Sequence, residues 1–412
     1  MASSPDRSIV IVGASLAGAK AAERLRKGDF DGPVVLIGAE SELPYERPPL
    51  SKDYLLGKAE RTAVRVHDEA WYAANDVDLR LGVTVTGIDP EGHTVETDDG
   101  ERLGFSRLLL TTGSSPRRLD VPGADLDGVH YLRKLPDSDA LRDVFGHGGR
   151  VVVVGAGWIG LETAAAARER GCEVTVVEPQ PAPLRAALGD ELGGWFGSVH
   201  RAHGVDLRLG TGIARITGEK ATTGVVTGDG TEIAADAVVV GVGITPNVEL
   251  AERAGLSVDN GVLVDARLGT SHPDVYAAGD VANGFLPRYG RHVRVEHWAN
   301  ALNGGPAAAR AMLGEDVTYD RIPYFFTDQY DVGMEFSGWF PPGGYDGVVL
   351  RGSLDEGAFF SFWLSGGRVV AGMHVNMWDD GVGPVEALID GGAQIDERRL
   401  ADPSVPLNEL AG

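Results

Sequence analysis

Two glycine-containing turns have the residue types and spacing that could bind a phosphate group. Residues 13–18 read GASLAG, and residues 155–160 read GAGWIG. Each turn follows a short apolar run and precedes a stretch rich in Ala and Leu, which predicts a strand, a turn and a helix. The N-terminus of a helix offers unpaired backbone N–H groups and the positive end of the helix dipole. Each turn can therefore bind the pyrophosphate of a dinucleotide.

A single turn of this kind is weak evidence, because chance matches are common in a chain with 58 glycines. Two turns in the same strand, turn, helix and strand context are strong evidence. Ser15 stands where the second glycine of the motif is expected, and its small side chain can still fit. The expected phosphate-contacting residues are Gly13, Ser15, Ala17 and Gly18 in the first turn and Gly155, Gly157, Trp158, Ile159 and Gly160 in the second.

An acidic residue follows the second apolar run of each unit. Glu178 can accept hydrogen bonds from an adenosine ribose, and its charge would repel a 2′-phosphate. Neither Pro179 nor Gln180 is basic, which favours NADH over NADPH. Glu40 is the matching candidate in the first unit, but Ala39 occupies a position where a second acid could stand, so a neighbour of Glu40 is an alternative.

Two Rossmann-type units are needed to position these residues. The first is predicted from strands 8–12 and 34–37 and helix 19–27, and the second from strands 150–154 and 174–177 and helix 161–170. Apolar runs at 108–113 and 237–242 predict crossovers that insert the second unit into the first. We expect an α/β fold in which residues 1–115 and 241–320 form one dinucleotide-binding domain and residues 116–240 form the other.

The sequence changes in character from about Pro323 onward. Aromatic residues cluster there, and runs such as 368–375 have a period of two, which predicts an antiparallel sheet. We expect residues 321–412 to form a third, α+β domain.

Composition argues against several classes of function. A net charge of −23, from 37 basic and 60 acidic side chains, disfavours nucleic acids and anionic membranes as partners. The one cysteine, Cys172, cannot form an internal disulfide or a CxxC pair, and we expect it to be buried. No apolar run is long enough to span a bilayer, and residues 1–8 lack the features of a signal peptide. We therefore expect a cytoplasmic protein.

Two histidines could be drawn as metal ligands. His200 and His203 have i, i+3 spacing in an expected helix, 190–202. Because no further His or Cys stands nearby, we expect no metal site.

A further segment indicates which unit binds which dinucleotide. Residues 270–280 read TSHPDVYAAGD, which resembles the second flavin-binding fingerprint of flavoproteins that bind two dinucleotides. The resemblance implies that Asp280 bonds the ribityl chain of FAD. The first unit would then bind FAD, and the second would bind NADH.

Residues 44–52 read PYERPPLSK, which resembles the signature of the oxygenase-coupled NADH:ferredoxin reductases of the putidaredoxin reductase and biphenyl dioxygenase reductase type. The similarity continues in GWIGLE at 157–162, EHWANA at 296–301 and PYFFTDQ at 323–329, and covers nearly the whole chain. Phe326 stands where this family often has tryptophan, so no electron path through that position is predicted.

The resemblance implies roles for individual residues. Arg47 and Lys52 would contact the flavin, Lys52 would pair with Glu162 beside the ring nitrogen that takes the hydride, and Trp298 would lie against the isoalloxazine. Lys52, Glu162 and Trp298 are thus the catalytic candidates. The remaining assigned residues are Thr112, Gly113, Gly279, Glu296 and His297 for FAD and Gly243 for NAD.

The function implied by this resemblance is that of an FAD-dependent NADH:ferredoxin reductase. Hydride would pass from NADH to FAD, and single electrons to a [2Fe–2S] ferredoxin serving a cytochrome P450 or a ring-hydroxylating dioxygenase. Such ferredoxins are acidic, so docking requires a local basic patch. The candidates for that patch are Arg288, Arg291, Arg294 and Arg310.

Two alternatives stay open from the sequence. The electron acceptor could instead be rubredoxin, oxygen or a quinone, as in an NADH oxidase or rubredoxin reductase. The chain could also be a redox-sensing flavoprotein similar to apoptosis-inducing factor. We expect a monomer or a weak homodimer.

Overall fold

The computed structural model describes residues 7–410. Residues 1–6, which carry most of the segment used in the targeting argument, lie outside this range. The chain divides into two compact units. Of the described residues, the first unit contains 7–47, 61–115 and 244–323, and the second contains 48–60, 116–243 and 324–410. Compact units are not by themselves domains, so the domain boundaries given above stay a prediction.

A parallel five-stranded sheet carries the first glycine turn. Its strand order is β19-β7-β1-β2-β3. The strands are β1 (Ile9–Val12), β2 (Val34–Gly38), β3 (Val77–Leu81), β7 (Arg107–Leu110) and β19 (Val275–Ala277). β1 and β2 are buried along their whole length, as expected for parallel strands covered on both faces.

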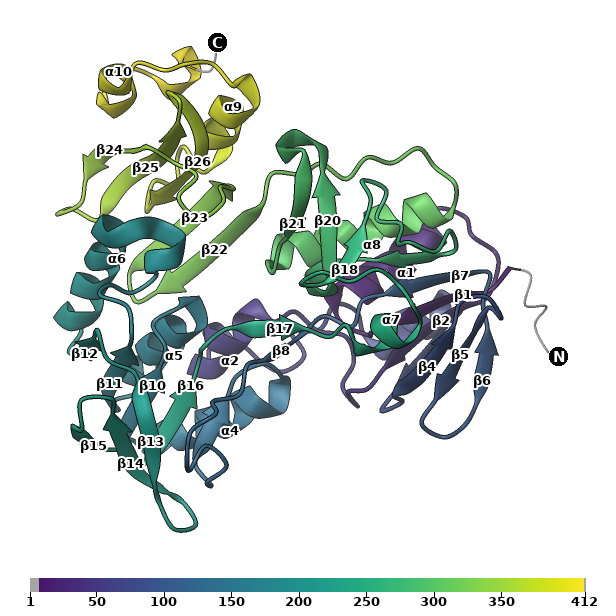
Figure 1. The fold of residues 1–412 in the computed structure, drawn as a ribbon, viewed down its shortest axis with the longest axis horizontal. Coiled ribbons are helices and arrows are strands. Elements are labelled where there is room, and N and C mark those ends of the chain that lie inside the picture. Colours follow the sequence, from purple (N-terminus) through teal and green to yellow (C-terminus); the bar gives the residue numbers. More distant parts are fainter. Residues whose placement is uncertain (1–6, 411–412) are drawn as a thin grey trace. The chain divides into compact units, whose positions relative to one another are not determined.

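Two helices of the first unit, α1 (Leu16–Lys27) and α8 (Trp298–Met312), pack against each other (Figure 1). Their backbones approach closely because small residues line the contact. A Cβ added at Gly305 would lie 2.1 Å from the backbone oxygen of Ala17, so only glycine fits there. This packing holds α1, and with it the first glycine turn, in place.

The rest of the first unit consists of smaller sheets and short helices. Their bounds are β4 (Val85–Asp89), β5 (Thr94–Thr97), β6 (Arg102–Gly104), β8 (Ser114–Pro116), β17 (Ile244–Pro246), β18 (Val262–Val264), β20 (Ala282–Leu286), β21 (Arg291–Arg294), α3 (Glu69–Ala74) and α7 (Glu249–Arg253). β4-β5-β6 and β18-β20-β21 are three-stranded sheets, and β8 pairs with β17.

A second parallel sheet, with the order β12-β11-β10-β16-β9, carries the second glycine turn. Its strands are β9 (Val129–Tyr131), β10 (Arg150–Val154), β11 (Glu173–Glu178), β12 (Asp206–Leu209) and β16 (Ala237–Val240). The helices of this part are α4 (Leu135–Gly146), α5 (Trp158–Glu169) and α6 (Arg185–Ala202). A three-stranded sheet follows, made of β13 (Ile213–Gly218), β14 (Thr222–Thr227) and β15 (Glu232–Ala234).

The C-terminal part of the second unit is an antiparallel sheet with the order β22-β23-β26-β25-β24 (Figure 1). Its elements are β22 (Tyr324–Gln329), β23 (Val332–Gly338), β24 (Gly347–Ser353), β25 (Ala358–Ser365), β26 (Arg368–Val375), α9 (Gly383–Gly391) and α10 (Glu397–Ala401). The short elements η2 (Pro48–Ser51) and α2 (Asp53–Leu56) also belong to the second unit. The predicted fold class, two Rossmann-like folds with a C-terminal α+β part, is confirmed.

The helix boundaries differ from the predicted ones in an informative way. Both nucleotide-binding helices begin within the glycine turn, at Leu16 and Trp158, because Gly18 and Gly160 adopt helical geometry there. α6 begins at Arg185, but Gly189 is non-helical, with φ 82° and ψ −176°. The uninterrupted part of α6 therefore matches the predicted range 190–202.

Candidate functional site

The first glycine turn leaves the N-terminus of α1 accessible to an anion. Gly13 has φ +118°, and a Cβ there would lie 2.1 Å from the backbone oxygen of Thr111. A Cβ at Gly18 would lie 2.2 Å from the backbone oxygen of Gly13. Ser15 caps the helix in an extended conformation but makes no capping hydrogen bond with its side chain. The first N–H groups of α1 are thus not satisfied by the Ser15 hydroxyl.

The three glycines of the second glycine turn differ in their backbone conformation and in the space around them. Gly155 has φ +98°, and a Cβ at Gly160 would lie 2.1 Å from the backbone oxygen of Gly155. Gly157 differs from both, because its φ of −78° suits any residue and a Cβ there would meet nothing within 4 Å. The chain itself therefore does not require glycine at this position. The open space at the start of α5 can admit a ligand that approaches the backbone closely, such as a pyrophosphate.

The side chain of Glu178 lies at this turn. Its Oε2 accepts a hydrogen bond from the backbone N–H of Ala156 at 2.7 Å, and its Oε1 accepts one from that of Gln180 at 2.8 Å. Each carboxylate oxygen can accept a second hydrogen bond, so both can still bind ribose hydroxyls. Glu178 thus supports the turn and stands where a nucleotide ribose is expected.

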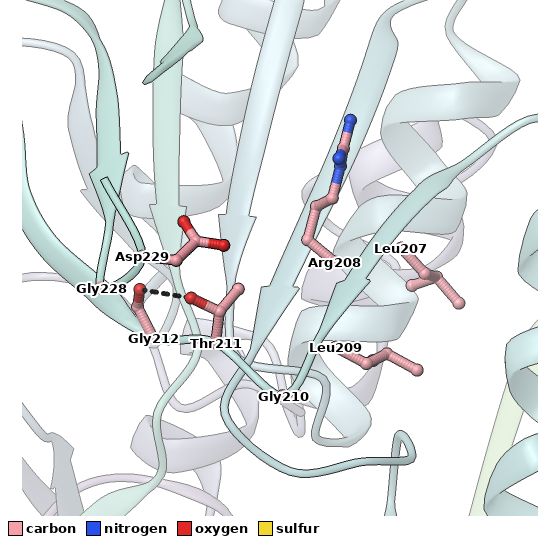
Figure 2. Close-up of a pocket in the computed structure, with 8 residues that line it drawn as sticks. All are labelled: Leu207, Arg208, Leu209, Gly210, Thr211, Gly212, Gly228 and Asp229. Atoms are coloured by element: carbon pink, nitrogen blue, oxygen red, sulfur yellow. Dashed lines mark hydrogen bonds between the residues drawn. The ribbon is translucent and has the colours of Figure 1, made fainter. Parts of the chain in front are cut away.

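An open pocket of about 560 Å³ lies beyond the end of β12 (Figure 2). It is lined by Leu207, Arg208, Leu209, Gly210, Thr211, Gly212, Gly228 and Asp229. The backbone N–H of Gly210 donates to the backbone oxygen of Gln180, and that of Thr211 donates to the backbone oxygen of Glu178. The pocket therefore borders the loop that carries Glu178. Ligands of α/β sheets bind at such carboxyl ends of strands. Sequence analysis missed this loop, although its GTG run after a strand was a detectable signal.

In the first unit, the structure brings the first glycine turn next to the segment that resembles the flavin fingerprint. A Cβ at Gly279 would lie 3.3 Å from the Cβ of Ala17. Asp280 accepts a hydrogen bond from the Ser114 hydroxyl at 2.7 Å. Nearby in sequence, Gly113 has φ +66°, and the hydroxyl of Thr112 donates to the backbone oxygen of Asn247 at 2.9 Å.

Arg47 and Glu40 form an ion pair with an N–O distance of 3.2 Å. Glu40 also accepts a hydrogen bond from the Tyr45 hydroxyl at 2.6 Å. Burial acts to lower the pKa of Arg47, but Tyr45, Glu40 and Asp280 outweigh burial and raise that pKa. Arg47 therefore places a permanent positive charge among the residues assigned to FAD.

The residues before α8 are also part of the first unit. Glu296 pairs with Arg294, and the indole N–H of Trp298 donates to Glu46 at 3.2 Å. His297 is the N-cap residue of α8. Burial lowers the pKa of His297 to about 4, although the charge of Asp280 opposes this. The His297 imidazole is therefore neutral at pH 7.

In the second unit, Lys52 and Glu162 form the ion pair that the resemblance implied, with an Nζ–Oε1 distance of 2.7 Å. The Lys52 side chain is 13% exposed and the Glu162 side chain 3% exposed. Ser51 donates to Oε2 of Glu162, and Thr327 donates to Oε1 at 2.6 Å. These hydroxyls stabilise a carboxylate that would otherwise be costly to bury.

Sequence analysis missed both hydroxyls. Ser51 stands next to Lys52, and Thr327 stands next to Phe326, whose ring centre lies 5.3 Å from the Lys52 Nζ. Each is part of a motif that was recognised, yet no local pattern indicated that they converge on Glu162. The function of Lys52 and Glu162 stays a prediction, but their mutual contact is a property of the structure.

Comparisons with known proteins place these features in a family. Residues 7–305 match the family described as Pyridine nucleotide-disulphide oxidoreductase, and residues 324–411 match the family described as Reductase C-terminal. The chain belongs to the pyridine nucleotide-disulphide oxidoreductases. The family resemblance drawn from residues 44–52 is confirmed.

Relatives of this oxidoreductase are similar over their full length. The ferredoxin–NAD(+) reductase component of the anthranilate 1,2-dioxygenase system of Burkholderia cepacia is 44% identical over 399 residues, which cover 97% of this chain and 98% of the relative. Putidaredoxin reductase of Pseudomonas putida is 36% identical, with 98% of this chain and 96% of the relative covered.

Solved structures agree with this placement. The ferredoxin reductase of the CYP199A2 system of Rhodopseudomonas palustris has a TM-score of 0.94 at 36% identity, covering 98% of this chain and 100% of the other. The structure of the covalent putidaredoxin reductase–putidaredoxin complex has a TM-score of 0.93 at 35% identity, covering 98% of both chains.

Despite the family name, this oxidoreductase has a single cysteine. Cys172 is fully buried, as predicted, and its Sγ lies 3.8 Å from the backbone oxygen of Phe145. Burial raises the pKa of the Cys172 thiol, although Arg168 and Arg170 oppose the rise. The chain thus contains no thiol pair that could accept electrons, and the thiol it has is poorly reactive.

The four arginines of the suggested docking patch lie on η4 (Pro287–Tyr289), β21 and α8. Arg288 pairs with Asp320, Arg294 with Glu296 and Arg310 with Glu315. The Arg294 side chain is only 9% exposed. The patch is therefore less positive than the sequence alone indicates, and its role stays a prediction.

The histidines considered as metal ligands contact other groups instead. His200 is buried and hydrogen bonds to Gln329, while the His203 ring stacks on Tyr330 at 3.7 Å. Among residues 7–410, no cluster of His, Cys, Asp or Glu has the geometry of a metal site. Over the same range, no helix is both long and apolar enough to cross a membrane.

Proposed function

We propose that this oxidoreductase passes electrons from NADH through FAD to a [2Fe–2S] ferredoxin, which serves an oxygenase such as a cytochrome P450 or a ring-hydroxylating dioxygenase. The observation that carries the proposal is the combination of two nucleotide-binding turns with one buried cysteine. Because no thiol pair can accept electrons within the chain, the acceptor is a separate molecule. Relatives named as ferredoxin–NAD(+) reductases of oxygenase systems support ferredoxin as that acceptor.

The first unit has the residues that FAD binding requires. When bound, FAD accepts a hydride from NADH and gives up the two electrons one at a time. The N-terminus of α1 would hold the pyrophosphate, Asp280 the ribityl chain, and Glu40 the adenosine ribose. The observation that supports this fit is that the Ser15 side chain makes no capping hydrogen bond at the N-terminus of α1.

Lys52 would stabilise the negative charge that builds up on the flavin ring, as the family resemblance implies. Glu162 would hold the Lys52 ammonium group in a fixed direction. Trp298 would lie against the isoalloxazine near the nicotinamide. These three residues are the candidates for contact with the reacting rings.

The second unit would bind NADH. The open position at Gly157 would admit the pyrophosphate, and Glu178 would bind the adenosine ribose. Trp158 and Ile159 begin α5, and Gly243, with φ +99°, follows β16. The pocket beyond β12 is where the adenosine end would extend. The Glu178 carboxylate would repel a 2′-phosphate and so favour NADH over NADPH.

Stopped-flow absorbance with the purified flavoprotein tests this proposal. NADH should bleach the flavin rapidly under anaerobic conditions, and NADPH should do so much more slowly. Cytochrome c reduction should then require an added [2Fe–2S] ferredoxin. A protein that binds no flavin on reconstitution, or whose flavin stays oxidised with NADH, would overturn the proposal. Rapid turnover with oxygen, quinone or rubredoxin alone would replace ferredoxin as the acceptor.

We also propose that Arg288, Arg291, Arg294 and Arg310 contribute to ferredoxin docking. Arg288→Glu combined with Arg291→Glu should lower the ferredoxin-dependent rate and its sensitivity to salt, because both depend on attraction between opposite charges. Arg102→Glu is a matched control, since Arg102 is a 72% exposed arginine on β6. If the double variant behaves like the control, the patch lies elsewhere.

The expected cellular location is the cytoplasm, where NADH and ferredoxins are available, and the expected state is a monomer or a weak homodimer. Cell fractionation and sedimentation of the purified protein test these two proposals. Recovery in the membrane fraction, or a dimer that persists at nanomolar concentration, would contradict them.

A further inference from the structure

A chain of buried hydrogen bonds leads away from Glu162 within the second unit. The Thr327 hydroxyl contacts Glu162, and the Gln329 side-chain nitrogen lies 3.1 Å from the Thr327 hydroxyl oxygen. The Gln329 oxygen in turn lies 2.8 Å from Nε2 of His200. Thr327, Gln329 and His200 are exposed by 1%, 2% and 0%, so water does not compete for these bonds.

The far end of the chain reaches the aromatic pair formed by Tyr330 and His203. The Tyr330 hydroxyl lies 3.4 Å from Nδ1 of His200, and the His203 ring stacks on the Tyr330 ring. Thr327, Gln329 and Tyr330 come from β22 and the turn after it, and His200 comes from α6 (Figure 1). All of these residues, with Lys52 and Glu162, belong to the second unit.

The charge of Glu162 fixes the direction of every bond in this chain. A carboxylate paired with Lys52 can only accept, so the single proton of the Thr327 hydroxyl must point to Glu162. The Thr327 oxygen is then an acceptor, and the Gln329 amide must present its N–H groups to it. This orientation leaves the Gln329 oxygen facing His200, which must therefore carry its proton on Nε2.

The properties of His200 and Tyr330 agree with this direction. Burial lowers the pKa of His200 to about 4, assisted by the nearby His203 and opposed by the Gln329 hydrogen bond, so the ring is neutral at pH 7. Burial raises the pKa of the Tyr330 phenol, which therefore stays protonated. A neutral ring with its proton on Nε2 has an acceptor at Nδ1, where the Tyr330 hydroxyl can donate.

We propose that Gln329 and His200 are positioning residues for the Glu162–Lys52 pair. The Gln329 amide donates to the Thr327 oxygen and is itself held by His200, so it supports the orientation in which the Thr327 hydroxyl donates to the Glu162 carboxylate. The importance of this pair for flavin chemistry rests on the proposed function. The coupling between Glu162 and the tautomer of His200 is independent of that function.

Nitrogen NMR of the ¹⁵N-histidine-labelled holoenzyme tests the coupling directly. The His200 signals, assigned by their loss in His200→Gln, should show a neutral ring with its proton on Nε2 at pH 7. A proton on Nδ1, or a doubly protonated ring at pH 7, would overturn the proposal. This test needs no variant other than His200→Gln.

Thr327→Val tests whether the direction is transmitted. The variant removes the hydroxyl, so the Gln329 amide can rotate and His200 should show both neutral tautomers. Thr227→Val is the matched control, because Thr227 is a buried threonine of β14 whose hydroxyl donates to Asp229, away from the chain. Loss of the single tautomer in both variants, or in neither, would contradict the coupling.

Gln329→Leu tests the consequence for the proposed reaction. Flavin reduction by saturating NADH should slow about tenfold, which corresponds to about 1.4 kcal/mol, while the Kd for NADH stays unchanged. An unchanged reduction rate would show that Glu162 does not need this support. If ferredoxin reduction fails in the unaltered protein, the proposed function is wrong, but the NMR results still decide the coupling.

Discussion

Gly157 shows how a single residue can indicate a ligand. Most glycines in nucleotide-binding turns serve the backbone or the packing, as Gly155 and Gly160 do here. Gly157 serves neither, since its φ is −78° and an added Cβ would meet nothing within 4 Å. The fold therefore leaves space at Gly157, and the position at the start of α5, within a glycine turn, favours a phosphate as the group that uses it.

Gly157→Ala should weaken NADH binding at least tenfold without loss of stability. The added Cβ would enter the space that the pyrophosphate occupies. Alanine also makes the unfolded chain less flexible than glycine does, which stabilises the folded protein by about 0.4–1 kcal/mol. Isothermal titration and thermal unfolding measure the two effects. Gly194→Ala is the matched control, because Gly194 lies in α6 and also has no neighbour within 4 Å of an added Cβ. Equal NADH affinity in both variants would disprove the assignment.

Glu178→Gln should reduce the preference for NADH over NADPH about tenfold. The variant keeps an oxygen for the Ala156 N–H but removes the charge that would repel a 2′-phosphate. The ratio of kcat/KM for the two nucleotides measures the change. Glu173→Gln, at the opposite end of β11, should leave the ratio unaltered. A ratio that does not move in Glu178→Gln would mean that other residues set the preference.

At the scale of elements, the crossing of α1 and α8 determines where the first turn lies. The helices can approach because Gly305 has no side chain, and its neighbour Gly304 has ordinary surroundings, with the nearest atom 3.7 Å from an added Cβ. Two adjacent glycines in one helix thus have different structural reasons. The sequence alone could not distinguish them.

Gly305→Ala should destabilise the protein by about 1–3 kcal/mol, because its Cβ would lie 2.1 Å from the Ala17 oxygen and force the helices apart. Gly304→Ala should be neutral or slightly stabilising, since alanine is the better helix former. Thermal unfolding of the two variants checks this difference. FAD should also dissociate more readily from Gly305→Ala, because Ala17 belongs to the first turn. Equal melting temperatures would contradict the close contact.

At the scale of the whole molecule, two histidines are neutral at pH 7. His297 lies in the first unit and His200 in the second, and burial lowers the pKa of each to about 4. Hydrogen bonds with Arg150 lower the pKa of Asp236 to about 2, against the effect of burial. Burial acts to raise the pKa of Glu23, but contacts with Lys20 and Lys27 outweigh burial and lower that pKa to about 2. The histidines and the carboxylates therefore respond to acid in different ranges of pH.

Stability should fall as the pH falls from 6.5 to 4. In this range the unfolded chain protonates both histidines, whose ordinary pKa is 6.5, whereas the folded chain does not. The unfolded state binds more protons, so each histidine costs about 3 kcal/mol by pH 4 and no more below it. The loss from Glu23 begins near its ordinary pKa of 4.5 and that from Asp236 near 3.8, and both continue toward pH 2.

Melting temperatures at pH 7, 6, 5 and 4 measure this dependence. His297→Asn should flatten the profile, and His147→Gln, at an exposed position, should not. A melting temperature that stays constant from pH 6.5 to 4 would show that these histidines are not buried in the neutral form.

The sequence by itself determined the features that depend on neighbouring residues. Apolar runs, glycine turns and period-two patterns identified the starts of both nucleotide-binding helices to within a few residues, β26 to the residue, and the parallel strands β1, β2, β7, β10, β11 and β16. They did not identify β3, β9 and β12, which are short or partly exposed. These patterns are readable because helix dipoles, backbone φ values and strand alternation act over only a few residues.

Only the tertiary structure decided which residues meet. Ser51 and Thr327 reach Glu162 from 111 and 165 residues away, and His200 reaches Gln329 across 129. The ion pairs that reduce the charge of Arg288 and Arg294 also appear only in the fold. Such contacts depend on how whole elements pack and on the cost of leaving a buried polar group unpaired, and neither is written in the spacing of residues along the chain.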